Sequence, residues 1–339
     1  MKRKTLSCSM LLIAFIFCIF LFPSPSKAAK KYNWKISHIR PAGFSVDKDC
    51  HWLADTLSEK TSGRINISVF PANQLGDYTV VQERIGLGAI EMSLACLSSE
   101  RDPRIQIIAM PYLCKNWDDV AKIYAPDGFV VQNICKFMEK QNIHIISSWP
   151  VYFGGIGTTK EAAEPGNPDV SKNVKIRIPT QKIYQLSSEA LGFQSTPIPW
   201  SDTFAAMQTG IVDGIIGGGG EAYYANLRDL IKYYYPYNDH VEMWFLYMNK
   251  DLWDSLSEED KDLVTSAGKT LEENRYKKVK EEEKEIEDKM AAFGIKIVPL
   301  SDAQLSACQS KIRKEVWPKL REDIGPEIVD QLIQESESE

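Results

Sequence analysis

The chain has 339 residues, of which 44% are apolar and 25% charged, an ordinary composition for a folded protein long enough to form two domains. Its 40 Lys and Arg residues and 46 Asp and Glu residues give a formal net charge of −6. This acidic balance argues against a nucleic-acid-binding protein, because such proteins present a basic face to the phosphates.

The first 28 residues have the pattern of an export signal. Three basic residues follow the initiator methionine, and an almost entirely apolar run of 17 residues extends from Leu6 to Phe22. Prolines then break the run, and Ser26-Lys27-Ala28 supplies the small residues of a cleavage site. The alternative is an uncleaved membrane anchor, for which this run is marginal in length. We therefore expect residues 1–28 to be a signal peptide and the mature protein to be periplasmic and not membrane-embedded.

The mature chain begins with alternating strand and helix signals. Residues 64–70 alternate apolar and polar side chains, which predicts a half-buried strand. The helix predicted over 47–60 ends before Gly63, a residue suited to a left-handed C-terminal cap. We also predict strands at 35–39 and 89–94, and a helix from the turn at 74–76 through residue 85. This order of elements predicts a mostly parallel sheet covered by helices.

The same alternation recurs in the second half of the chain. We predict strands at 143–147, 174–178 and 211–216, and helices at 183–191 and 200–209. A long charged helix is predicted from about residue 258 to residue 290. Because its apolar positions leave gaps, we expect it to lie across other elements with one face in solvent, where Glu–Lys pairs four residues apart stabilise it.

Sequence templates for catalysis and metal binding find no match in this chain. The four histidines form no HxxH or HExxH pair, and no GxSxG nucleophile motif is present. The glycines at 217–220 are followed by Glu221 instead of the Lys and Ser or Thr of a phosphate-binding loop. We therefore expect no enzyme activity, no metal and no cofactor. Because the cysteines after the signal are odd in number, we expect buried thiols instead of a disulfide framework at Cys50, Cys96, Cys114, Cys135 and Cys308.

One arginine stands out at a predicted strand end. Arg177 lies among apolar neighbours in Lys175-Ile-Arg177-Ile-Pro179, and the proline ends the strand. At the carboxyl end of a parallel strand it would face the crevice where open α/β sheets bind ligands. Its planar fork matches a carboxylate with two hydrogen bonds. A structural ion pair would produce the same pattern, so both interpretations stay open on the pattern alone.

Four segments carry a family pattern: Glu59–Ile65, Val69–Gly76, Lys175–Pro179 and Ala206–Gly214. Together they resemble the DctP-type solute-binding proteins of TRAP transporters. Their order and spacing match along nearly all of the mature chain, as do His240 and the long helix. The resemblance implies the two-lobed periplasmic binding protein fold, an α/β fold in which a mostly parallel sheet flanked by helices forms each lobe and the long helix spans both. Lobe I is expected over 29–153 plus 244–283, and lobe II over 154–243 plus 284–339.

The resemblance also implies a function and site residues. Such a protein captures an organic anion in the periplasm and passes it to a small and a large membrane subunit, which import it with an ion gradient. Feeding a sensor kinase is the alternative role. In the family the arginine equivalent to Arg177 pairs with the ligand carboxylate. Thr180 adds a polar contact, and Trp200 lies against the ligand.

The departures from the family pattern guide the choice of ligand. Many members carry an Asn that contacts the carboxylate where this chain has Ile215-Ile216-Gly217-Gly218, and Cys96 and Leu97 lie where sugar-acid binders place polar contacts. An unpaired buried polar group costs ~1–3 kcal/mol, so such a site disfavours a polyhydroxylated acid. The glycines would also leave space beside the ligand. We therefore expect a bulky aromatic monocarboxylate, such as an indolic or phenyl acid or an aromatic amino acid, with a sugar acid or other small carboxylate as the alternative.

Further candidate ligand contacts come from the same region and from the aromatic residues near it. They are Trp149, Tyr152, Cys96, Gly217, Gly218 and Glu221. Glu221 would accept a hydrogen bond from a ligand amine or indole, or cap a helix.

Overall fold

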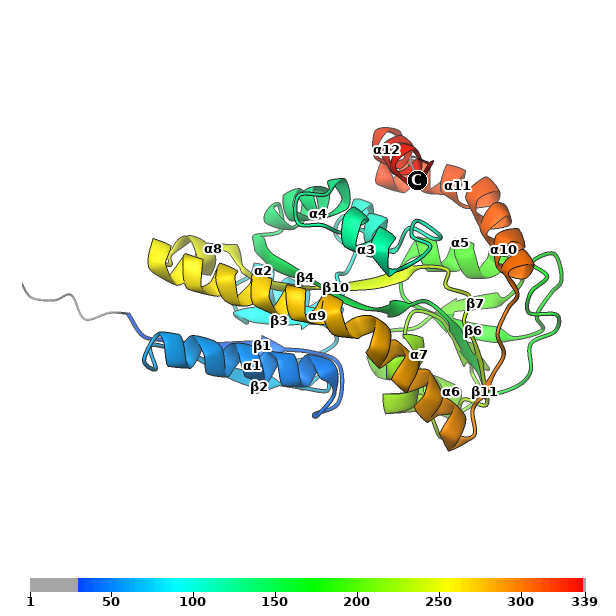
Figure 1. Cartoon of the computed structure of the whole chain (residues 1–339), viewed down its shortest axis with the longest axis horizontal. Coiled ribbons are helices and arrows are strands. Elements are labelled where there is room, and N and C mark those ends of the chain that lie inside the picture. Colours follow the sequence, from blue (N-terminus) through cyan, green and yellow to red (C-terminus); the bar gives the residue numbers. More distant parts are fainter. Residues whose placement is uncertain (1–29, 338–339) are drawn as a thin grey trace, which may run out of the picture.

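The structure is a computed structural model in which residues 30–337 are described, and the predicted signal peptide lies outside the described residues. The strands form two separate sheets, one for each lobe (Figure 1). The sheet of the first lobe has the strand order β2-β1-β3-β10-β4. Its strands are β1 (Tyr32–Ser37), β2 (Ile65–Phe70), β3 (Met92–Ala95), β4 (Ile143–Phe153) and β10 (Val241–Asn249).

The sheet of the second lobe has the order β11-β9-β5-β8-β6-β7. Both sheets are mixed, so they are less parallel than the sequence pattern indicates. In the first sheet β1 is parallel to β2 and β3, whereas β10 runs antiparallel to β3 and β4. The chain leaves the first lobe along β4 and returns to it along β10, so these two long strands run in opposite directions. The strands of the second sheet are β5 (Ile156–Thr158), β6 (Lys175–Ile178), β7 (Gln194–Pro197), β8 (Gly214–Ile215), β9 (Tyr233–Tyr235) and β11 (Lys296–Ile297).

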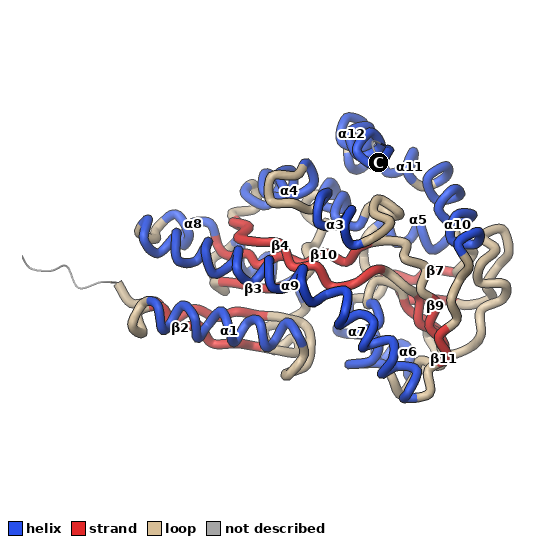
Figure 2. The backbone as a smooth tube through the Cα atoms, viewed as in Figure 1, coloured by secondary structure: helices blue, strands red, loops and turns tan. Residues whose placement is uncertain are grey.

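Helices cover the sheets, and the tube drawing in Figure 2 shows the alternation of helix and strand along the chain. In the first lobe they are α1 (Ser45–Lys60), α2 (Tyr78–Gly86), α3 (Trp117–Ile123), α4 (Phe129–Glu139), α8 (Lys250–Asp254) and the 3-10 helix η1 (Pro103–Ala109). The remaining short elements are α5 (Lys182–Ala190), α6 (Thr203–Gln208), α7 (Gly219–Ala222), the 3-10 helix η2 (Trp200–Asp202) and the π-helical turn η3 (Tyr223–Leu227). The chain ends in α10 (Asp302–Glu315), α11 (Trp317–Ile324) and α12 (Pro326–Glu337).

The long helix α9 (Glu258–Phe293) confirms the charged helix predicted from the sequence, and it passes along both lobes (Figure 1). The Ser257 side chain caps its first turn, which is acidic and complements the helix dipole. Gly294 ends it with φ 104°, a left-handed conformation that glycine adopts at low cost. No helix within residues 30–337 is both long and apolar enough to cross a membrane.

The other predicted elements agree with the structure to different degrees. The helices predicted over 47–60 and 183–191 and the strand over 64–70 are confirmed within two residues, as α1, α5 and β2. The strand predicted at 143–147 continues to Phe153. The strand predicted at 211–216 is wrong in extent, because only Gly214–Ile215 pair and the chain turns at Gly217 with φ 78°.

Two glycines carry the chain from the first sheet to the second. Gly154 and Gly155 separate β4 from β5. A Cβ atom on Gly154 would lie 2.2 Å from the His240 ring, and one on Gly155 would lie 2.5 Å from the Tyr234 hydroxyl. Only glycine fits at these two positions without displacing the packed rings, so Gly154 and Gly155 have a structural role.

Candidate functional site

A cavity lies between the two lobes, at the carboxyl ends of β1 and β6. Its volume is about 30 Å³, roughly the space of two water molecules. A ligand therefore needs the lobes or the lining side chains to move apart. The first lobe contributes Ile39, Arg40, Tyr78, Cys96, Leu97, Ile108 and Ala109, β10 contributes Val241, Glu242, Met243 and Trp244, and the second lobe contributes Arg177, Pro179, Gln181, Tyr184, Trp200 and Gly217.

Arg177 lies at the cavity wall with only 1% of its surface exposed. Its Nε donates to the Ile198 carbonyl at 2.8 Å and one terminal nitrogen donates to the Ile216 carbonyl at 3.4 Å. Its guanidinium carbon lies 5.7 Å from the centre of the Trp200 ring. Burial lowers the pKa of Arg177. Within residues 30–337 no carboxylate forms an ion pair with this guanidinium.

A second buried arginine faces the same cavity and is absent from the sequence prediction. Arg40 follows β1 and lies between two indole rings, 5.1 Å from the centre of Trp200 and 4.8 Å from that of Trp244. Its Nε lies 3.6 Å from the Glu221 carboxylate, an ion pair too long for a hydrogen bond, and its NH2 group donates to the Gly218 carbonyl at 3.4 Å. The sequence does contain a signal for Arg40, because Arg40 comes directly after a predicted strand and before Pro41, much as Arg177 lies at a strand end shortly before Pro179.

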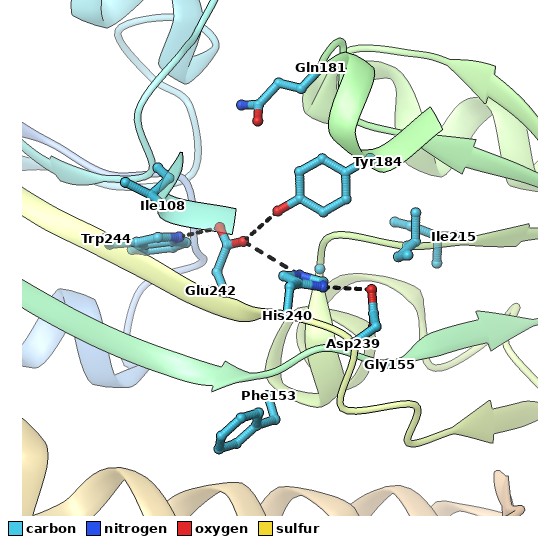
Figure 3. A network of polar contacts seen from close by, with 12 residues as sticks. Ile108, Phe153, Gly155, Gln181, Tyr184, Ile215, Asp239, His240, Glu242 and Trp244 are labelled. Carbon is cyan, nitrogen blue, oxygen red and sulfur yellow. Dashed lines mark hydrogen bonds and ion pairs between the residues drawn. The ribbon is translucent and has the colours of Figure 1, made fainter. Parts of the chain in front are cut away.

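A carboxylate also lines the cavity. Figure 3 shows Glu242 of β10 pointing toward Tyr184 of α5, with Trp244 on its other side. One oxygen of Glu242 accepts from the Trp244 indole at 2.7 Å and the other accepts from the Tyr184 hydroxyl at 3.2 Å. Glu242 is 9% exposed. The Tyr184 hydrogen bond therefore joins the two lobes across the cavity.

A buried histidine stands behind this carboxylate. The Nε2 atom of His240 lies 3.9 Å from Glu242, and its Nδ1 atom lies 2.9 Å from an oxygen of Asp239 (Figure 3). Burial alone would lower the pKa of His240, but the charge and hydrogen bond of Asp239, together with the charge of Glu242, raise it.

The candidate residues from the sequence divide into two groups. Those that line the cavity are Arg177, Trp200, Gly217 and Cys96. Thr180 instead faces the other lobe, where its hydroxyl donates to Glu100 at 3.1 Å, and the Gly218 carbonyl and Glu221 hold Arg40.

The aromatic candidates Trp149 and Tyr152 lie away from this cavity. Trp149 is fully buried, stacks on Trp244 and donates its indole N–H to Asp49 at 2.8 Å. Tyr152 and Glu221 border a separate cavity of about 370 Å³ beside α9. Within the described residues, no three His, Cys, Asp or Glu side chains gather as a metal site, and the five cysteines described there form no disulfide.

The glycines after β8 do not leave space for a ligand. A Cβ atom would lie 2.7 Å from Pro179 at Gly217, 2.6 Å from Tyr223 at Gly218 and 2.3 Å from the Tyr152 ring at Gly219. Protein atoms therefore occupy the volume that the sequence argument assigned to a bulky ligand.

The chain matches the model of bacterial extracellular solute-binding protein, family 7 (DctP), over residues 36–323. It is 25% identical to the sialic acid-binding periplasmic protein SiaP of Vibrio cholerae over 252 residues, which are 72% of this chain and 76% of that protein.

Solved structures show a similar fold. A TRAP periplasmic solute binding protein from Desulfovibrio salexigens with bound orotic acid has a TM-score of 0.82 at 17% identity, over 91% of this chain and 99% of that chain. One from Haemophilus influenzae with bound L-gulonate has a TM-score of 0.81 at 20% identity, over 90% and 100%. Because the family match spans most of the sequence, this chain belongs to the bacterial extracellular solute-binding protein family 7, the DctP family.

Proposed function

We propose that this protein captures an organic carboxylate in the periplasm and delivers it to the small and large membrane subunits of a TRAP transporter. The observation that carries the proposal is the buried guanidinium of Arg177 at the cavity between the lobes. A buried charge without a partner is costly, so the site favours an anion that supplies the missing charge. The sialic acid, orotic acid and L-gulonate named for the similar proteins are all carboxylates.

The position of Arg177 suits a carboxylate in particular. Carbonyls of two neighbouring segments hold Nε and one terminal nitrogen, so the fork has a set orientation at the cavity. A carboxylate can then accept two parallel hydrogen bonds from a guanidinium, which a lysine cannot provide. Trp200 packs beside the same guanidinium and supplies apolar contact area.

Closure of the lobes completes the proposed capture. Contacts across the cleft include the Tyr184–Glu242 hydrogen bond, the Gln181 amide donating to the Leu97 carbonyl at 3.3 Å, and the Ser201 backbone donating to Asp77 at 3.2 Å. The lobes follow the ranges expected from the sequence, 29–153 plus 244–283 and 154–243 plus 284–339, except that residues 241–243 move with the first lobe because β10 belongs to its sheet. They turn about the connections near residues 154 and 240. An opened cleft admits the ligand, and these bonds close over it.

The polar groups that line the cavity, and not an apolar space beside the glycines, are the basis for inferring the class of ligand. Since protein atoms fill the space beside the glycines, the sequence argument for an indolic or phenyl acid has lost its physical support. The binding test therefore includes aromatic acids, sugar acids, dicarboxylates and amino acids, with none of these classes preferred in advance.

Titration calorimetry and thermal shift on the mature protein, with this panel of carboxylates, test the proposal. Losing a buried charge partner costs ~2–5 kcal/mol, so Arg177→Ala should weaken binding by about 30-fold or more at ~1.4 kcal/mol per decade. Arg177→Lys keeps the charge without the fork and should also weaken binding. The exposed Arg84→Ala is the matched control and should bind as the wild type does. Unchanged affinity in Arg177→Ala would overturn the anchor assignment.

A further inference from the structure

The cavity contains a feature that a receptor for a simple anion does not need. Glu242 presents a buried carboxylate to the same space as Arg177. Its oxygens each accept one hydrogen bond, from Trp244 and from Tyr184. A carboxylate offers about four acceptor positions, so two remain available for a donor in the cavity.

Among the charges around the cavity, Arg177 has no ion-pair partner within residues 30–337, and Glu242 has only the His240 ring, at 3.9 Å. Arg40 is paired with Glu221, and His240 is hydrogen-bonded to Asp239. No Lys or Arg among residues 30–337 forms an ion pair with Glu242, and none of the carboxylates described there pairs with Arg177. One cation from β6 and one anion from β10 thus face the space between the lobes.

The charge balance decides which ligand suits this pair. Even with His240 protonated, the group of Asp239, His240 and Glu242 carries one net negative charge, which Arg177 offsets. A monoanionic ligand would pair with Arg177 and leave the net negative charge of this group buried without a counter-charge, and a second ligand carboxylate beside Glu242 would add like-charge repulsion. A molecule carrying both charges would pair with both residues and leave the buried site neutral.

We propose that the ligand is a zwitterion, whose carboxylate pairs with Arg177 and whose protonated amine donates to Glu242. The proposal rests on the proposed function and narrows its substrate class to amino acids and related amino carboxylates. Tyr184 positions the Glu242 carboxylate when the lobes close, because its hydroxyl reaches Glu242 from the opposite lobe (Figure 3). Arg40, already neutralised by Glu221, contributes to the wall beside Trp200 and Trp244.

Matched pairs of ligands test this inference on the unmodified protein. Each pair differs only in one group: alanine and lactate, valine and 2-hydroxyisovalerate, phenylalanine and 3-phenyllactate, proline and tetrahydrofuran-2-carboxylate, and 4-aminobutyrate and butyrate. Calorimetry should give the amino member of at least one pair about 30-fold or higher affinity than its partner, because the partner brings no cation to offset the net negative charge at Glu242. Succinate should bind more weakly than that amino member.

The variant Glu242→Gln keeps the side-chain shape and removes the charge. It should lower the affinity of the preferred amino acid by about 30-fold or more and leave the affinity of its matched partner, which lacks the amine, unchanged or higher. Glu161→Gln, on an exposed residue paired with Lys296, is the matched control and should keep the wild-type preference. If Glu242→Gln fails to fold, the wild-type pairs still decide the question.

The outcomes separate the two proposals. If lactate-type ligands, succinate or sugar acids bind as tightly as the best amino acid and lose affinity in Arg177→Ala, the carboxylate receptor stands and the zwitterion inference is overturned. If no carboxylate of the panel binds, or if binding is indifferent to Arg177, both proposals fail. A preference for the amino members that survives in Glu242→Gln overturns the role of Glu242.

Discussion

The carboxyl group of Glu283 should make the stability of this protein depend on pH near neutrality. Glu283 of α9 lies where β4 ends. One of its oxygens accepts from the Phe153 backbone N–H at 2.6 Å and the other accepts from the Trp117 indole at 3.2 Å. Burial raises the pKa of Glu283 to about 7 from its ordinary 4.5, although both hydrogen bonds act in the opposite direction.

The direction of this pH dependence depends on the protonation of Glu283 in the folded and in the unfolded state. Between pH 4.5 and about 7 the folded protein holds a proton on Glu283 and the unfolded chain does not. The free energy of unfolding therefore falls as the pH rises through this window, and the loss is complete above the folded-state pKa. A pKa difference of about 2.5 at 1.36 kcal/mol per unit corresponds to at most about 3 kcal/mol. The effect is an upper limit because the Glu283 side chain is partly exposed.

Urea unfolding of wild type and Glu283→Gln at pH 5, 6, 7 and 8 measures this effect. The variant cannot ionise at this position, so its stability relative to the wild type should increase by up to about 3 kcal/mol between pH 5 and pH 8. Other titrating groups cancel in the difference. Glu285→Gln, which removes an exposed carboxylate paired with Lys289 on the same helix, should show no such trend. Parallel stability curves for wild type and Glu283→Gln would refute the reasoning.

Two further predictions concern the packing of the lobes. The Nζ atom of Lys172 is buried and donates to three backbone carbonyls within residues 164–170, so Lys172→Met should destabilise the protein by about 3 kcal/mol or more in urea unfolding; an unchanged midpoint would contradict this role. At Gly268 an added Cβ atom would lie 2.5 Å from Ile146, so Gly268→Ala should cost ~1–3 kcal/mol despite the higher helix propensity of alanine. Ser266→Ala at an exposed position of the same helix should change the melting temperature little, and equal melting temperatures for both variants would show that α9 tolerates the contact.

Local signals predicted the elements whose structure depends mainly on their own residues. The two ends of α9 are marked by the Ser257 cap and by Gly294, and the period of two over 64–70 predicted β2. The strand β10 gave no such signal. All of its residues are buried, so it lacks the alternation of a half-exposed strand.

The candidate site was predictable only in part, because only some of its residues are marked by their neighbours in the sequence. A strand followed by a proline predicted that Arg177 lies at the carboxyl end of a strand, and Arg177 lines the cavity between the lobes. The role of the glycines could not be deduced from the sequence, because the atoms that fill the space around Gly218 and Gly219 come from Tyr223 and from Tyr152, which lies far away in the chain.

The sequence by itself determined the family, the two-lobed α/β fold and one arginine at a strand end, because each depends on motifs or on neighbours within a few residues. Only the tertiary structure decided which charges share a cavity. Arg40, Arg177 and Glu242 come from three distant segments, and Glu221 neutralises one of the two arginines. Charge pairing in a buried site depends on distances in space, and these are set only when the two sheets and the strands between them have packed together.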